Sequence, residues 1–182
     1  MAGRFLFTSP RLGFRNWEEA DLDVLARLNA DPEVMRYFPA PLTREESRSM
    51  LVQLQEHFAS RGYTYYATEL LSTGEFVGLI GLKYQEYTAT FTPATDIGWR
   101  LRKEFWGQGY ASEGAKRCLD HAFEDLGLNR VVSVCPALNT ASERVMRKIG
   151  MQRQGEFEHP GLQGSARLNP CVWYEVKNTY LP

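Results

Sequence analysis

The chain has 182 residues, of which 43% are hydrophobic, so it can bury a sizeable core and we expect one domain over residues 1–182. Its 21 basic and 22 acidic residues almost cancel, which argues against nucleic acid as a partner. Its apolar runs are too short for a signal peptide or a membrane span, so we expect a soluble, cytoplasmic protein with no membrane partner.

The first half of the chain combines helical and strand periodicities. Asp31 followed by Pro32 is typical of a helix start, and Thr43 with Glu46 forms a capping box before a helix that Gly62 ends. The predicted elements are a strand at Leu12–Arg15, helices at Glu18–Asn29, at Pro32–Tyr37 and between Thr43 and Gly62, a hairpin of strands at Tyr63–Leu71 and Phe76–Tyr84, and a strand at Asp96–Arg102.

The second half begins with the most regular helix of the chain, because apolar residues recur at helical spacing from Ala111 to Leu126, before Gly127. The strand Arg130–Cys135 follows this crossover and is expected to run parallel to the preceding strand. The remaining predicted elements are a helix at Thr140–Ile149, capped by Asn139, and strands at Gln152–Glu158 and Cys171–Lys177. This order predicts an α/β fold, a mixed sheet with helices on both faces.

The segment Trp106–Ser112 carries the most informative motif, two glycines between a predicted strand and a predicted helix. Exposed backbone N–H groups and the positive end of a helix attract phosphate, and Gly107 and Gly109 allow a diphosphate to approach closely. A plain turn that uses glycine for its backbone angles is the alternative. Dinucleotide-fold and nucleoside-triphosphate motifs do not match, because the third glycine, the following acid and a Gly-Lys-Ser/Thr triplet are absent.

The runs DIGWRL at Asp96–Leu101 and FWGQGYASEG at Phe105–Gly114 resemble the GNAT superfamily of N-acetyltransferases, in particular its ribosomal-protein-alanine N-acetyltransferase branch. The NTAS run at Asn139–Ser142 before Gly150, the TSPRL run at residues 8–12 and the DPEVM run at residues 31–35 resemble the same branch. The resemblance implies the GNAT fold, a central, mostly antiparallel sheet with one splayed parallel strand pair, and acetyl-coenzyme A as co-substrate.

The resemblance also implies how coenzyme A is held. The diphosphate would bind the backbone amides of Gly107, Gln108, Gly109, Tyr110, Ala111 and Ser112. The pantetheine arm would pair with the strand that contains Trp99, Arg100, Leu101 and Arg102, and Asn139 would contact the arm from the other side. A backbone N–H between Trp99 and Leu101 would stabilise the oxyanion.

Acetyl transfer by direct attack in a ternary complex needs a neutral amine and a proton for the departing thiolate. Ser142 resembles the serine that protonates coenzyme A in this branch, with help in helix capping as its alternative role. Asp96 is a candidate for relaying the amine proton through water, although acids at strand ends are commonly just solvated. His159 is expected in a loop near the acceptor, where it could equally be idle.

The acceptor is expected to be a primary amine, with a preference for a protein or peptide N-terminal α-amine or an amino-acid-like small molecule. An α-amine of pKa near 8 is about one-tenth neutral at pH 7, whereas lysine is neutral in below about one part in a thousand. Trp17, Tyr37 and Phe38 could line the acceptor pocket, with core packing as the alternative for each. A coenzyme A-binding sensor or scaffold is the competing function, and either a monomer or a homodimer is compatible with the sequence.

No metal cofactor is predicted. Cys118, Cys135 and Cys171 are odd in number and widely spaced, and no two histidines lie four residues apart. We therefore expect reduced, structural thiols and no metal in catalysis.

Overall fold

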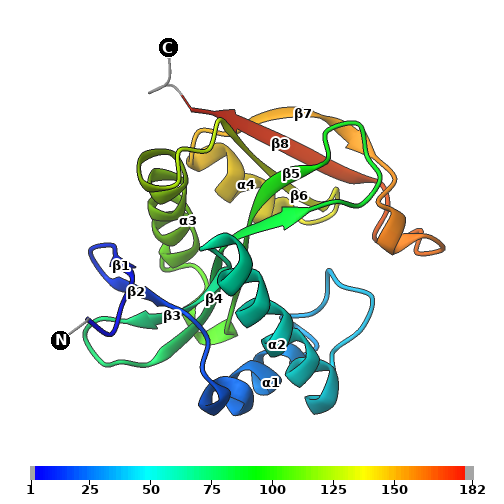
Figure 1. Ribbon diagram of the computed structural model, residues 1–182. Helices are drawn as coiled ribbons and strands as arrows, with labels where there is room; N and C mark the ends of the chain where they lie inside the picture. The colour runs from blue at the N-terminus through cyan, green and yellow to red at the C-terminus, as the bar shows by residue number, and fades with distance from the viewer. Residues whose placement is uncertain (1–2, 179–182) are drawn as a thin grey trace.

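A computed structural model describes residues 3–178, in which eight strands form one sheet in the order β1-β2-β3-β4-β5-β6-β8-β7 (Figure 1). The strands are β1 (Phe7–Thr8), β2 (Leu12–Arg15), β3 (Tyr65–Leu70), β4 (Phe76–Gln85), β5 (Ala94–Leu101), β6 (Arg130–Pro136), β7 (Gln152–Phe157) and β8 (Cys171–Lys177). Neighbouring strands are antiparallel except β5 and β6. The predicted mixed sheet with one parallel pair is confirmed, and β1 is an additional edge strand.

The parallel strands β5 and β6 stay together only briefly. Their register has one pair, Asp96 with Val132, and the Ser133 hydroxyl donates to the Ile97 carbonyl at 2.9 Å. Beyond this point β5 remains paired with β4 and β6 with β8, so each strand follows a different neighbour. A wedge therefore opens between the carboxyl-terminal halves of β5 and β6.

Helices cover both faces of the sheet, as predicted (Figure 1). They are α1 (Leu22–Ala30), α2 (Arg44–Arg61), α3 (Tyr110–Asp120) and α4 (Thr140–Lys148), with short helical turns at Glu19–Asp21, Lys103–Phe105, His121–Asp125 and Pro160–Leu162. Because successive strand residues point to opposite faces, Leu79 packs against α1 and α2 whereas Ile80 belongs to the core beneath α3.

The predicted helix boundaries follow local hydrogen bonding. The Thr43 hydroxyl accepts the Glu46 N–H at 3.2 Å while the Glu46 carboxylate accepts the Thr43 N–H at 2.7 Å, which completes the capping box of α2. Gly62 ends α2 with φ 78°, and Gly127 follows the helical turn after α3 with φ 64°. Asn139 caps α4 with its side chain, as expected.

The predicted helix at Pro32–Tyr37 does not form, and this segment is a succession of turns. The Asp31 side chain accepts the Glu33 N–H at 2.8 Å, and the Met35 N–H donates to the Asp31 carbonyl at 2.9 Å. Asp31 thus caps the segment as predicted. The next hydrogen bond, from the Phe38 N–H to the Met35 carbonyl, spans only three residues and forms a turn instead of continuing a helix. The segment leaves α1 and crosses toward β5.

A buried ion cluster joins the first strands to α1. The Arg15 guanidinium donates to both carboxylate oxygens of Asp21 at 2.7 Å and to Glu69 at 2.6 Å. All three residues are buried. These bidentate bonds satisfy the charges that folding removes from water.

The three cysteines are unpaired and buried, which agrees with structural thiols. Across the described residues, no helix combines the length and apolar character needed to cross a membrane.

Candidate active site

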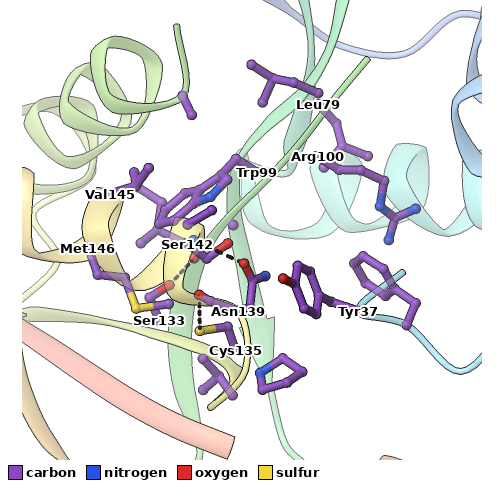
Figure 2. A pocket seen from close by; sticks show the side chains of 18 of the residues that line it. Tyr37, Leu79, Trp99, Arg100, Ser133, Cys135, Asn139, Ser142, Val145 and Met146 are labelled. Carbon is purple, nitrogen blue, oxygen red and sulfur yellow. Dashed lines mark hydrogen bonds between the residues drawn. The ribbon is translucent and has the colours of Figure 1, made fainter. Parts of the chain in front are cut away.

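A cavity of about 840 Å³ occupies the wedge between β5 and β6 (Figure 2). Its walls come from β5, β6, the turns after α1, and the starts of α3 and α4. In Figure 2, Ser142 and Asn139 lie on one side of the cavity and face Tyr37 and Arg100 on the other. Most of the predicted site residues are thus brought to one space.

The segment Trp106–Ser112 forms an open cradle at one end of this cavity. Gly107 and Gly109 have φ of 73° and 83°, a conformation that requires glycine, and a Cβ on Gly107 would meet no atom within 4 Å. Among the described residues, the N–H groups from Gly107 to Ser112 have no hydrogen-bond partner. The predicted donors are therefore available, although the positive φ angles alone also account for both glycines.

Arg11 braces the cradle from the far end of the chain. Its guanidinium donates to the Gln108 carbonyl at 3.1 and 3.2 Å and to the Glu113 carboxylate at 2.6 Å. The Ser9 hydroxyl donates to the same carboxylate at 2.7 Å. These contacts engage the Gln108 carbonyl and the Glu113 carboxylate, and they leave the cradle N–H groups unused. Single-sequence reasoning missed this role because no local pattern links residue 11 with residue 108.

The two faces of β5 serve different parts of the site. Trp99 and Leu101 pack toward the core beneath α3, whereas Arg100 points to the side of α1 and α2. All three line the cavity. The other two predicted side chains do not, because Arg102 binds Glu75 at 3.0 Å and the Gln108 amide donates to the Glu104 carbonyl at 2.7 Å.

The start of α4 presents a serine hydroxyl to the cavity. The Asn139 side chain accepts the Ser142 N–H at 3.1 Å and so fixes the first turn of the helix (Figure 2). The Ser142 hydroxyl itself has no partner among residues 3–178. Capping therefore uses the main chain of Ser142 and leaves its side chain available for chemistry.

Asp96 lines the cavity near the start of β5 and is held by two side chains that the sequence did not single out. The Tyr65 hydroxyl donates to one carboxylate oxygen at 2.5 Å and the Gln85 amide donates to the other at 3.1 Å. Burial raises the pKa of Asp96 to about 6, despite the opposing effect of these two hydrogen bonds. A carboxylate with this pKa is ionised at pH 7 and can take up a proton readily.

His159 also lines the cavity, in contact with Tyr87 at a ring-centroid distance of 4.5 Å. Burial lowers the pKa of His159, so the imidazole is neutral at pH 7. Its Nδ1 accepts the Gly161 N–H at 3.0 Å, which leaves Nε2 as the nitrogen directed away from the loop.

The predicted acceptor-side aromatics separate into two groups. Tyr37 and Phe38 line the cavity from the turns after α1. Trp17 does not, because it is only 3% exposed, packs on Phe76 and donates from its indole N–H to the Tyr65 carbonyl at 2.5 Å. The structure thus corrects the assignment of Trp17 to core packing, the alternative considered for it.

Within the described part of the chain, no three histidine, cysteine, aspartate or glutamate side chains lie close enough to hold a metal ion.

A cradle of free backbone amides at a helix start, beside a splayed parallel strand pair, is a site that suits a diphosphate. The chain belongs to the GNAT acetyltransferase family, since the model of the acetyltransferase (GNAT) domain matches residues 11–152. It is an acetyl-coenzyme A-dependent N-acetyltransferase.

Individual relatives agree with this family. The chain is 29% identical over 151 residues to the uncharacterized N-acetyltransferase YnaD of Bacillus subtilis, which covers 83% of the chain and 85% of YnaD. It is 36% identical over 138 residues to the FsC-acetyl coenzyme A-N(2)-transacetylase of Aspergillus fumigatus, covering 72% of the chain and 58% of that protein.

Among solved structures, a GNAT-family acetyltransferase of Bacillus anthracis superposes with a TM-score of 0.76 at 26% identity and covers 94% of the chain and 97% of its own. These matches establish the family, whereas the ribosomal-protein branch stays a prediction.

Proposed function

We propose that the enzyme acetylates a primary α-amine, on an amino-acid-like small molecule or on a protein or peptide N-terminus, by direct attack in a ternary complex. The observation that carries this is one cavity with unpartnered cradle amides at one end and a half-buried carboxylate, Asp96, on the proposed acceptor side. An α-amine needs less help in losing its proton than a lysine, which suits a site with one carboxylate of pKa about 6.

The described residues fit coenzyme A. The amides from Gly107 to Ser112 would hold the diphosphate, and the β6-facing edge of β5, which has no strand partner after Ile97, would pair with the pantetheine arm. Asn139 would border the arm from α4. Acetyl-coenzyme A supplies an acyl group activated as a thioester.

The base acts on the attacking amine, and the acid acts on the departing thiolate. Asp96 accepts the proton of the amine, directly or through a water, and the Tyr65 and Gln85 bonds keep its carboxylate in place. The free Ser142 hydroxyl donates a proton to the departing thiolate and takes one up from solvent in return. A backbone N–H of β5 near Trp99 stabilises the oxyanion without a side chain.

Acceptor selectivity is assigned to Tyr37, Phe38 and His159, which line the acceptor side. Together they give an aromatic wall that suits a short organic chain behind the amine. The resemblance to ribosomal-protein-alanine N-acetyltransferases favours an N-terminal α-amine. The relative named as an acetyl coenzyme A-N(2)-transacetylase agrees with acetyl transfer to nitrogen.

Calorimetric titration with coenzyme A, followed by thiol release across N-terminal peptides, free amino acids and polyamines, tests the proposal. We expect binding and turnover that is faster with α-amines than with polyamines. Absence of both heat and thermal stabilisation would reject the cofactor site. Binding without turnover across the whole panel would favour a coenzyme A sensor or scaffold.

A further inference from the structure

Arg100 is a half-buried cation without an acidic partner among the described residues. Its Nη1 donates to the Asn29 amide oxygen at 2.5 Å, and its guanidinium lies 4.1 Å from the centroid of the Phe38 ring. Its Nε is enclosed and has no hydrogen-bond partner, and none of the described carboxylates forms an ion pair with it. Burial lowers the pKa of Arg100 to about 10, so the side chain is still cationic at pH 7.

The contrast with Arg15 shows what this fold does with a buried guanidinium that serves structure alone. Arg15 has two carboxylates, Asp21 and Glu69, and uses three of its nitrogens on them. A charge held away from water without such partners is destabilising. The cost at Arg100 is offset if a ligand brings the missing negative charge.

The position of the Arg100 side chain favours the acceptor as this ligand. Arg100 lines the cavity and lies on the same face of β5 as Asp96, about 13 Å away along the strand. The cradle amides, which suit the diphosphate, are in the segment after β5. In Figure 2 the Arg100 side chain extends to the side where Tyr37 lies, opposite Ser142.

We propose that Arg100 binds a carboxylate of the acceptor, so that the preferred acceptors are amines that also carry an anionic group; this rests on the proposed acetyl transfer to an amine. Nε and Nη2 form one edge of the guanidinium, and carboxylates bind such an edge with two parallel hydrogen bonds. Phe38, which also lines the cavity, lies against the guanidinium and limits its movement. Polyamines, which are cationic throughout, would be poor acceptors.

Matched probes test the proposal. Glycine, β-alanine, 4-aminobutyrate and the peptide Ala-Glu are each compared with the corresponding amide, Ala-Gln for the peptide, at saturating acetyl-coenzyme A. The readouts are kcat/KM from thiol release and calorimetric affinity for coenzyme A-loaded protein. The ratio between carboxylate and amide is compared among wild type, Arg100→Gln, Arg100→Lys and, as control, Arg130→Gln, a β6 arginine paired with Glu175. Because both probes are measured on one sample, a partly unfolded variant does not change the ratio.

We expect at least one pair for which wild type prefers the carboxylate about tenfold or more, a preference lost in Arg100→Gln, partly kept in Arg100→Lys and intact in Arg130→Gln. The proposal is overturned if no pair shows such a preference, or if Arg100→Gln keeps it. A selective loss of coenzyme A affinity in Arg100→Gln would also overturn it, by assigning the arginine to the cofactor. Carboxylate-selective binding without turnover would retain the anion site and reject acetyl transfer.

Discussion

The two ends of the cavity are built in different ways. The cradle offers main-chain N–H groups of six consecutive residues, Gly107–Ser112, whereas the proposed acceptor side uses side chains from separate strands, with Asp96 on β5 held by Tyr65 of β3 and Gln85 of β4. Backbone donors depend on local conformation, so a substitution harms them through φ and ψ. Side-chain groups depend on identity, so a substitution that keeps the shape can still remove the chemistry.

The largest effect is expected at Asp96. Asp96→Asn keeps the size of the side chain but removes the proton acceptor, and we expect kcat/KM to fall about 10²- to 10⁴-fold in a thiol-release assay. Asp23→Asn, an exposed change on α1, is the control. A fall of less than about threefold would exclude Asp96 as the base.

The stability of the Asp96→Asn variant separates chemistry from folding. The pKa of Asp96 is raised to about 6 from 3.8, so the native state holds the proton more tightly than the unfolded chain. The ionised carboxylate therefore lowers the free energy of unfolding as pH rises from about 4 to 6. At pH 7 the variant should melt at or above the wild-type temperature, and a lower temperature would indicate a structural role.

The cradle is broken through its backbone. Gly109→Val places a β-branched residue at φ 83°, and we expect affinity for coenzyme A to fall about 100-fold, measured by calorimetry. Gly62→Val is the matched control, because Gly62 has φ 78° at the end of α2, away from the cavity. Both variants should lose stability, but only the first should lose binding. Equal affinities would reject the cradle.

Ser142 gives a smaller effect. Ser142→Ala removes the hydroxyl but keeps the N–H that Asn139 accepts, so α4 should start unchanged. We expect kcat to fall about tenfold with coenzyme A affinity within about twofold of wild type. Ser60→Ala, at the end of α2, is the control. An unchanged kcat would leave the thiolate to be protonated by solvent.

The smallest effect is a pH dependence. As pH falls through about 6, Asp96 becomes protonated and can no longer accept the amine proton. The ratio of wild-type to Asp96→Asn kcat/KM cancels the ionisation of the acceptor itself. It should be half its pH 8 value near pH 6 and lower below. A ratio that is flat from pH 5 to 8 would contradict the assignment.

The same difference between the two ends explains what could be predicted from the sequence. Every predicted strand and four of the five predicted helices correspond to elements near the expected bounds. They could be predicted because periodicity and caps such as Thr43 are local signals. The cradle could be predicted for the same reason. The partners of Asp96 could not, since strand register brings Tyr65 and Gln85 to it across the sheet.

Two further misses have local explanations. The segment after Asp31 begins with a helix start signal, but it forms turns instead, which bury Val34 and Met35. Trp17 resembles a pocket aromatic in sequence, yet its indole N–H is satisfied inside the core by a backbone carbonyl. Only the three-dimensional neighbours distinguish these roles.

The bracing of the cradle by Arg11 means that the glycine motif is not a portable module. The Gln108 carbonyl and the Glu113 carboxylate are bound by Arg11, which lies 97 and 102 positions earlier and directly precedes β2. Transplanting residues 96–150 into another scaffold would transfer the sequence motif without the Arg11 contacts that brace it. The shape of the cradle therefore depends on folding of the first strands as well as on the motif itself.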